Sequence, residues 1–307
     1  MSILFLSPTG QVGGAEAALQ EMLAGLREAH PSWPLVLVVA SDGPLVNRVR
    51  ALGVTVEVLP FPAPLARFGD WGVRGGVWPA IALLVRGAPA AWSALRYLHQ
   101  LRRLVRRHRP TLIHTNGHKM HLLGAWASSR GIPVVWHFHD FATGRWLTSK
   151  LLRRSARRCA AIVANSRSVA EDAKRICGDA PPVHAVWNAV DLARFAPDGP
   201  TIDLDTAAQL PPAERDVVRI GLVSTYARWK GHATFLEALS LLPASLPVRG
   251  YIIGGPVYET AGSQVSVEEL RDRAHSLGLG TRVGFTGFIA DASSAMRALD
   301  IVVHAST

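Results

Sequence analysis

Residues 1–40, MSILFLSPTGQVGGAEAALQEMLAGLREAHPSWPLVLVVA, contain the pattern that decides the fold. An apolar run at residues 3–6 leads through a glycine-rich turn into a helix-like stretch at 15–28, and a second apolar run follows at 35–40. Short apolar runs that alternate with longer helical segments are typical of a parallel sheet with helices on both faces. We therefore expect an α/β fold.

The same alternation continues through the rest of the chain. Further strands are predicted at residues 54–59, 112–114, 134–136, 161–164, 183–186, 217–223, 248–253, 282–285 and 301–303. Helices are predicted at residues 45–52, 91–107, 120–129, 147–158, 169–176, 233–242, 267–277 and 292–299. Residues 195–214 interrupt the pattern with Pro, Asp and Ala, and we interpret them as a linker in which Asp203 and Asp205 are ordinary surface charges.

These elements predict two doubly wound, Rossmann-like parallel-sheet domains, residues 1–200 and residues 201–307. The second domain is expected to be incomplete, because the chain ends at Thr307 directly after a strand that should lead into a loop and a helix. Ligands of such sheets bind outside the carboxyl ends of the strands. The chain is therefore expected to stop where a binding loop would begin.

The composition limits the class of protein. Of the 307 residues, 49% are hydrophobic, which is ample for two packed cores and excludes disorder as the main state. The only cysteines, Cys159 and Cys177, indicate reduced thiols in the cytoplasm rather than a disulfide scaffold. No transmembrane helix is evident.

The charge is unevenly distributed. Residues 1–200 carry 24 Lys+Arg and 12 Asp+Glu, whereas residues 201–307 carry 9 and 11. A basic first domain suggests an anionic partner, and nucleic acid, anionic lipid or a phosphorylated ligand would each fit. The basic segments 96–109 and 145–158 are compatible with helices on an anionic membrane surface, or with the solvated faces of packed helices. No RNA-binding signature is present, so nucleic acid is not expected as a partner.

The first turn contains Gly10, Gly13 and Gly14. Their order differs from G-x-G-x-x-G, and no acidic residue follows about twenty positions on, which disfavours a NAD-dependent dehydrogenase. Gly13 and Gly14 would let the backbone approach a ligand closely, and the free N–H groups of the following helix would attract phosphate. A plain tight turn is the alternative.

Five histidines lie within residues 114–139: His114, His118, His121, His137 and His139. Zinc needs several converging ligands, and no cysteine, glutamate or supporting pattern accompanies these histidines, so no metal site is expected. If the strand continues beyond residue 136, His137 and His139 lie on the same side. His139 then lies at the carboxyl end of the strand, where ligands bind and reactions take place in such sheets. A histidine satisfied by Asp140 is the alternative.

In the second domain, Arg228 and Lys230 lie two residues apart, just before a predicted helix. Two cations beside a helix N-terminus can together neutralise a diphosphate. A solvated loop with extended basic side chains is the alternative.

Taken together, these segments resemble the GT-B glycosyltransferases known as glycosyltransferase family 4 (group 1). The segments that carry the resemblance, in the family's order and spacing, are GGAE at 13–16, FHD at 138–140, ANSR at 164–167, WNAVDLARF at 187–195, WKGH at 229–232, GG at 254–255, GFTGF at 284–288 and DIVVHAS at 300–306. The resemblance covers nearly the whole chain.

The resemblance implies a GT-B-like fold and transfer of a sugar from a nucleotide-sugar donor to a glycan or lipid-linked acceptor. Such transfer usually retains the anomeric configuration and needs no essential metal or other cofactor. His139 would contact the donor sugar near the reacting centre as the catalytic residue, and Gly13 and Gly14 would approach the donor phosphates. Lys230 would contact the diphosphate, and Arg228 would replace the arginine that many members carry where this chain has Thr225.

The resemblance also implies a place in the cell and leaves alternatives. The enzyme would work in the cytoplasm, at the inner face of a membrane, as a peripheral protein. The family's Glu-x7-Glu motif, which contacts the donor, would follow Thr307, so we expect the 307-residue form to be inactive or weakly active. A non-catalytic truncated transferase that serves as a membrane or partner scaffold, and a GT-B nucleotide-sugar epimerase, are the other function classes.

Overall fold

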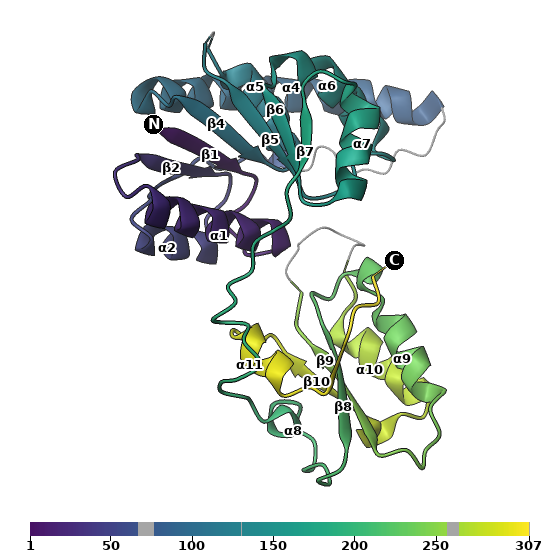
Figure 1. The fold of residues 1–307 in the computed structure, drawn as a ribbon. Helices are drawn as coiled ribbons and strands as arrows, with labels where there is room; N and C mark the ends of the chain where they lie inside the picture. The colour runs from purple at the N-terminus through teal and green to yellow at the C-terminus, as the bar shows by residue number, and fades with distance from the viewer. Residues whose placement is uncertain (67–76, 130, 257–263, 307) are drawn as a thin grey trace. The chain divides into compact units, whose positions relative to one another are not determined.

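The computed structural model describes residues 1–66, 77–129, 131–256 and 264–306, and Figure 1 shows its two compact units. Unit 1 comprises Met1–Val190 and unit 2 comprises Asp191–Thr307, so the division falls earlier in the chain than residue 200. Each unit contains one parallel sheet with buried apolar clusters on both of its faces. The predicted α/β class with two doubly wound sheets is confirmed.

Unit 1 is built on a seven-stranded parallel sheet with the order β3-β2-β1-β4-β5-β6-β7. Its strands are β1 (Ile3–Ser7), β2 (Leu35–Val39), β3 (Thr55–Val58), β4 (Leu112–Asn116), β5 (Val134–Phe138), β6 (Ala161–Ala164) and β7 (Val183–Ala185). All five residues of β1 are buried, because helices cover both faces of the sheet. The strand order reverses between β1 and β4, which makes this pair the topological switch point.

The helices of unit 1 are α1 (Gly14–Ala29), α2 (Pro44–Ala51), α3 (Ala63–Ala66), α4 (Val77–His108), α5 (His118–Ala127), α6 (Trp146–Ser155), the 3-10 turn η1 (Ala156–Arg158) and α7 (Arg167–Cys177). Successive strand side chains point to opposite faces of the sheet. Ile3 and Phe5 pack with Leu19 on the face that α1 and α2 cover. Leu4 and Leu6 pack on the other face, which α4, α5, α6 and α7 cover (Figure 1).

Unit 2 has a four-stranded parallel sheet with the order β10-β9-β8-β11. Its elements are α8 (Leu204–Ala207), β8 (Val218–Val223), the 3-10 turn η2 (Arg228–Lys230), α9 (His232–Ser240), β9 (Val248–Ile253), α10 (Val267–Ser276), the 3-10 turn η3 (Gly280–Arg282), β10 (Val283–Gly287), α11 (Ala292–Arg297) and β11 (Ile301–Val303). One apolar cluster joins Leu222 to Phe235 of α9 and Leu270 of α10, and a second joins Tyr251 to Ala295 of α11.

The prediction that residues 195–214 form a linker is wrong, and Asp205 is not a surface charge, whereas Asp203 is exposed as predicted. Leu204 and Asp205 are buried, and α8 packs against β10. Arg297 of α11 holds the preceding segment, since its Nε donates to the Ala196 carbonyl at 2.9 Å and its Nη1 to the Pro200 carbonyl at 2.9 Å. The residues that order this segment lie far along the chain, so the local sequence gives no sign of its ordered structure. Its Pro, Asp and Ala content alone is typical of a linker.

The helix α4 begins at Val77, well before the predicted start at residue 91. Within the described ranges, no helix combines the length and the apolar character needed to cross a membrane.

Candidate active site

The turn after β1 places the candidate glycines at the switch point. Gly10 is packed so closely that a Cβ atom on it would lie 2.4 Å from the Ser41 carbonyl oxygen, so the fold itself requires this glycine. Gly14, the first residue of α1, is exposed, and a Cβ atom on it would meet nothing within 4 Å. The space beside Gly14 is therefore open, as the approach of a ligand requires.

A carboxylate already occupies the start of α1. Glu16 Oε2 accepts a hydrogen bond from the Gly13 N–H at 3.1 Å, and Glu16 is only 7% exposed. Burial raises the pKa of Glu16 above its ordinary value, and the negative charge of Asp140 acts in the same direction. A phosphate that approached Gly13 would meet this competing acceptor, whereas the Gly14 side of the turn is open.

His139 directly follows β5, at the carboxyl edge of the sheet. Its ring centroid lies 4.1 Å from that of His137, which confirms that the two side chains share one side of the strand. His139 Nε2 lies 3.0 Å from Asn116 Oδ1, so in the described structure its hydrogen-bond partner is Asn116 at the end of β4, not Asp140. Burial, with a contribution from His114, lowers the pKa of His139 to about 4, and the ring is neutral at pH 7.

Two residues without a predicted role hold the backbone around His139. Asn165 Nδ2 donates to the His139 carbonyl at 3.1 Å. Asp172 of α7 is fully buried and accepts hydrogen bonds from the Ala142 N–H at 2.8 Å, from the Thr143 N–H at 3.2 Å and from the Thr143 hydroxyl. Burial acts to raise the pKa of Asp172, but these hydrogen bonds outweigh it and the pKa is lowered. The loop that follows His139 is thus tied to α7.

The other histidines of the cluster are buried beneath the same strand ends. The His114 and His137 ring centroids lie 5.3 Å apart, and His121 Nδ1 donates to Thr115 Oγ1 at 2.8 Å. Burial lowers the pKa of His114 and His137 to about 3, that of His118 to about 4, and that of His121 well below its ordinary value. In the part of the chain that the structure describes, no three His, Cys, Asp or Glu side chains are arranged to hold a metal ion.

In unit 2, the loop between β8 and α9 contains both candidate cations. Gly231 follows them with φ 74°, and a Cβ atom on it would lie 2.0 Å from the Ala305 carbonyl oxygen. The turn therefore packs backbone to backbone against the segment after β11, at the carboxyl edge of the sheet. Lys230 is partly exposed, and no described residue forms an ion pair with it. Lys230 lies two residues before α9, and an anion bound there would also be stabilised by the helix N-terminus.

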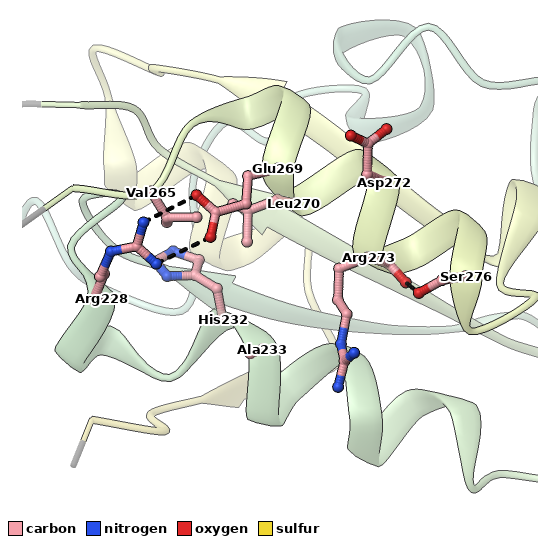
Figure 2. Close-up of a pocket in the computed structure, with 9 residues that line it drawn as sticks. All are labelled: Arg228, His232, Ala233, Val265, Glu269, Leu270, Asp272, Arg273 and Ser276. Carbon is pink, nitrogen blue, oxygen red and sulfur yellow. Dashed lines mark hydrogen bonds and ion pairs between the residues drawn. The ribbon is translucent and has the colours of Figure 1, made fainter. Parts of the chain in front are cut away.

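Arg228 is held by an acidic partner. Its Nη1 and Nη2 donate to the two carboxylate oxygens of Glu269 on α10, at 2.9 and 3.1 Å (Figure 2). The pair lines a pocket of about 500 Å³ between α9 and α10, together with His232, Ala233, Val265, Leu270, Asp272, Arg273 and Ser276. Lys230 is not among the residues that line this pocket, so the pocket does not unite the two predicted phosphate ligands.

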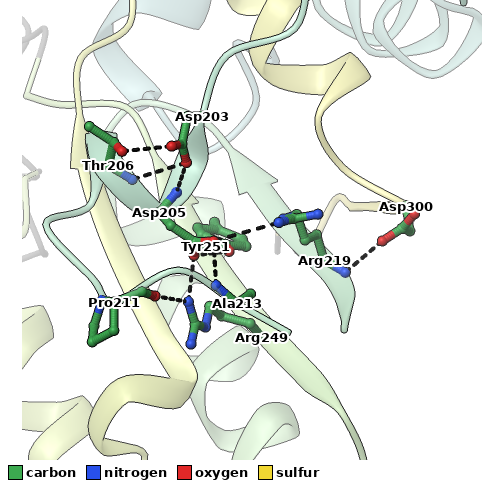
Figure 3. A network of polar contacts seen from close by, with 9 residues as sticks. All are labelled: Asp203, Asp205, Thr206, Pro211, Ala213, Arg219, Arg249, Tyr251 and Asp300. Carbon is green, nitrogen blue, oxygen red and sulfur yellow. Dashed lines mark hydrogen bonds and ion pairs between the residues drawn. The ribbon is translucent and has the colours of Figure 1, made fainter. Parts of the chain in front are cut away.

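A second polar cluster lies at the amino ends of β8 and β9, at the edge of the sheet opposite η2 (Figure 3). Asp205 accepts hydrogen bonds from Arg249 Nη1 at 2.5 Å, from the Tyr251 hydroxyl at 2.7 Å and from the Ala213 N–H at 2.9 Å, and Arg219 Nη2 lies 3.5 Å away. Burial acts to raise the pKa of Asp205, but these partners lower it. Because ligands bind at the carboxyl edge, this network stabilises the fold of unit 2 and is not part of the site.

The structure thus brings the predicted residues together in two groups. Gly13, Gly14 and His139 lie at the carboxyl edge of the sheet in unit 1, and Arg228 and Lys230 share one turn at the carboxyl edge in unit 2. Each group presents what a phosphorylated sugar requires: an open backbone turn and a neutral histidine at one edge of the sheet in unit 1, and cations in unit 2.

The two parallel sheets have the fold of the GT-B glycosyltransferases. Residues 12–194 match the family model described as Glycosyltransferase Family 4, and residues 215–307 match the model described as Glycosyl transferases group 1. The chain belongs to glycosyltransferase family 4. No curated protein matches it in sequence.

Solved structures share this fold along the whole chain. Anabaena Alr3699/HepE, in complex with UDP, has a TM-score of 0.72 and 23% identity, and the match covers 100% of this chain and 74% of that chain. Sucrose-phosphate synthase from Thermosynechococcus elongatus has a TM-score of 0.68 and 14% identity, with 100% and 75% covered. WaaG, a glycosyltransferase involved in lipopolysaccharide biosynthesis, has a TM-score of 0.62 and 14% identity, with 100% and 75% covered. The predicted GT-B-like fold is confirmed.

Proposed function

We propose that this glycosyltransferase takes a nucleotide-sugar donor and transfers its sugar to a glycan or lipid-linked acceptor, with retention of configuration and without an essential metal. The observation that carries the proposal is the position of Lys230 in η2, in the loop that connects the carboxyl end of β8 to the start of α9. The complexes of Alr3699/HepE with UDP and with UDP-glucose support a uridine diphosphate sugar as the first donor to test.

The proposed chemistry follows from where charge develops. The acceptor hydroxyl oxygen bonds to the anomeric carbon, the bond from that carbon to the diphosphate oxygen breaks, and the hydroxyl proton leaves with the diphosphate. Negative charge grows on the departing diphosphate, so a fixed cation beside it stabilises the transition state more than the ground state. Lys230 supplies this cation, Gly14 leaves room for phosphate, and His139 contacts the sugar as a neutral group.

Nucleotide binding and transfer test the proposal separately. Lys230→Ala is expected to weaken the binding of UDP by about tenfold or more, since a charge-assisted contact is lost. Lys174→Ala, which removes an exposed lysine from α7, is the matched control and is expected to change nothing. Equal UDP affinity in the Lys230→Ala variant would contradict the proposal.

Product analysis distinguishes the other function classes. Transfer from UDP-sugars to glycan and lipid-linked acceptors is expected to continue in the presence of EDTA, and the anomeric configuration of the product can be read by NMR. Conversion of the donor sugar without any acceptor would indicate an epimerase. The absence of nucleotide binding would favour a scaffold.

We also propose that the face formed by α4, α5, α6 and η1 docks on an anionic lipid surface, which would make the enzyme a peripheral membrane protein of the cytoplasm. Residues 91–158 contain 14 Lys+Arg and one acidic residue, Asp140. Arg103 and Arg106 of α4 and Arg154 and Arg157 at the end of α6 and in η1 are exposed. Such a density of uncompensated positive charge is attracted to anionic headgroups.

Trp126 of α5 connects this helix to α4, α6 and η1 within the basic face. Arg158 of η1 lies over the Trp126 ring at 4.0 Å, Arg102 of α4 donates twice to the Trp126 carbonyl at 2.9 and 3.2 Å, and the indole Nε1 donates to Ser155 Oγ at 3.0 Å. Trp126 and Trp146 are both exposed, and tryptophan is favoured at the boundary between headgroups and water. The face thus offers fixed cations interspersed with aromatic rings.

Vesicle flotation tests the basic face. Native protein is expected to float with anionic vesicles at low salt and to be released by high salt, but not to float with neutral vesicles. The double change Arg103→Glu with Arg106→Glu is expected to abolish flotation. Arg48→Glu with Arg50→Glu, on α2 at the opposite face of the same sheet, is the matched control. Recovery that does not depend on lipid charge, or that falls equally in both double variants, would contradict the proposal.

A further inference from the structure

The side chain of Asn116 lies between two imidazole rings at the switch point. It is 1% exposed, at the last position of β4. Its Oδ1 lies 3.0 Å from His139 Nε2, and its Nδ2 lies 3.5 Å from His114 Nδ1. An amide oxygen only accepts hydrogen bonds and an amide nitrogen only donates them. His139 therefore carries its proton on Nε2, and His114 Nδ1 is unprotonated.

This arrangement leaves one nitrogen of the His139 ring unprotonated and able to accept a hydrogen bond. With the proton on Nε2, His139 Nδ1 has a free lone pair, and it is buried without a hydrogen-bond partner in the described structure. A buried acceptor that lacks a partner is costly, so such an atom points to a group that the protein itself does not supply. Asn165 holds the His139 carbonyl from the other side, so both the backbone and the ring are fixed.

We propose that Asn116 is a positioning residue that holds His139 in the neutral form protonated on Nε2, so that Nδ1 accepts a hydrogen bond from a hydroxyl group of the bound sugar. This inference rests on the proposed contact between His139 and the sugar. A hydroxyl donates to an unprotonated nitrogen and would lose that bond if the ring were charged or carried its proton on Nδ1. Asn116 thus determines which ring nitrogen of His139 accepts the hydrogen bond from the sugar hydroxyl, without touching the sugar itself.

The surroundings of His139 determine how it responds to pH. The titratable groups around it are His114 on β4, His137 on β5, His121 on α5 and the adjacent Asp140. Burial and His114 oppose a charge on His139, and Asn116 adds no charge of its own. A carboxylate in place of the Asn116 amide would reverse this balance, because it still accepts from Nε2 but favours the charged ring.

The tautomer can be read in the native protein without any variant. Long-range proton–nitrogen NMR spectra of protein with labelled histidine are expected to show His139 neutral at pH 7 with its proton on Nε2. A proton on Nδ1 would overturn the proposal directly. In Asn116→Leu, which removes the acceptor, the preference for Nε2 is expected to be lost.

Asn116→Asp provides the kinetic test. The pKa of His139 is expected to rise by about two units, and the acid limb of the kcat profile is expected to move by the same amount, whereas donor KM changes little. Above this limb the variant is expected to transfer sugar better than Asn116→Leu, which is expected to lose about 10- to 100-fold in kcat. Asn47→Asp, an equal change of charge at an exposed position of α2, is the control and is expected to leave the profile unchanged.

The outcomes separate this inference from the proposed function. If His139→Ala transfers sugar as the native protein does, the proposed contact fails, and the inference fails with it. If His139→Ala is impaired but the Asn116 variants keep the native tautomer and the native pH profile, only the inference about Asn116 is overturned. A shifted profile in Asn116→Asp with an unshifted one in Asn47→Asp supports it.

Discussion

Arg228 and Glu269 face each other across η2 and α10, with each guanidinium Nη atom on its own carboxylate oxygen, at 2.9 and 3.1 Å. The two side chains are 54% and 51% exposed, so solvent screens the pair and its contribution to stability is small. A diphosphate carries more negative charge than one carboxylate. We therefore expect Arg228 to exchange Glu269 for the donor when a nucleotide binds.

Glu269→Gln removes the competitor of the diphosphate. The affinity for UDP is expected to rise by a factor of about 1.4 to 5, which corresponds to the ~0.2–1 kcal/mol that an exposed ion pair contributes. Titration calorimetry measures the change. Glu237→Gln is the control. Glu237 of α9 forms a comparable exposed ion pair with Arg273 of α10, and its loss is expected to leave the affinity for UDP unchanged. Weaker binding in Glu269→Gln would mean that Arg228 acts by holding η2 against α10.

Gly14 and Gly25 allow steric access to be separated from helix stability. Both lie in α1, and a Cβ atom on either would meet nothing within 4 Å, so alanine at either position is expected to leave the fold intact. Gly25→Ala is expected to stabilise the helix by ~0.5–1 kcal/mol, since glycine is the poorer helix former. Gly14→Ala alone is expected to weaken UDP binding, because its methyl group fills the space that the phosphates would use. Equal nucleotide affinity in the two variants would remove Gly14 from the site.

The buried histidines predict that unit 1 loses stability in mild acid. In the folded state the pKa values of His114 and His137 lie at about 3, and those of His118 and His139 at about 4, whereas an unfolded histidine has a pKa near 6.5. The unfolded chain therefore binds more protons between these values, and stability falls as the pH drops below about 6.5, by ~1.4 kcal/mol per pH unit for each histidine. Urea unfolding at pH 7 and pH 5, followed by tryptophan fluorescence, measures this loss.

His137→Phe isolates one contribution to this acid sensitivity. Both ring nitrogens of His137 are buried without a hydrogen-bond partner among the described residues, so the substitution removes two unsatisfied groups and one titrating site. The variant is expected to be at least as stable as the native protein at pH 7 and to lose less stability at pH 5. His99→Phe, at an exposed position of α4, is the control and is expected to keep the native acid sensitivity.

The buried ion pairs of Asp205 are expected to contribute strongly to the free energy of unfolding of unit 2. Asp205→Asn leaves Arg249 and Arg219 without their buried carboxylate, and the loss of one partner of such a pair costs ~3–5 kcal/mol. The pKa of Asp205 is lowered, so its contribution is present at neutral pH and is lost as the pH falls through that lowered value. Urea denaturation measures the difference at pH 7. Asp198→Asn, at an exposed position, should leave the unfolding midpoint in place, and an equal midpoint for Asp205→Asn would contradict the assignment.

The sheets could be predicted because both of their faces are covered. A strand buried on two sides has an unbroken apolar run, and the runs at residues 3–6 and 35–40 correspond to β1 and β2. His139 could be placed at a strand end for the same reason. The buried role of Asp205 could not be predicted, because its partners follow it by many residues and the local sequence is polar.

The groups that position the site could be predicted only in part. Glu16 lies three residues after Gly13, the spacing of a capping box, so the sequence did contain a signal for its hydrogen bond to the start of α1. Asn116 had no such signal, because its contact with His139 depends on β4 lying beside β5. Glu269 likewise meets Arg228 only because α10 packs next to the η2 turn.

The attachment of residues 142 and 143 to Asp172 has a practical consequence for engineering. A loop exchange in unit 1 would replace the segment between β5 and α6 as a single piece. A loop taken from a protein without a carboxylate at the corresponding position of α7 is not built to donate to Asp172, so the exchange would leave this buried carboxylate short of hydrogen-bond donors. The loop between β5 and α6 is best exchanged together with α7. Chimaeras that keep the loop and α7 from the same protein should fold where exchanges of the loop alone do not.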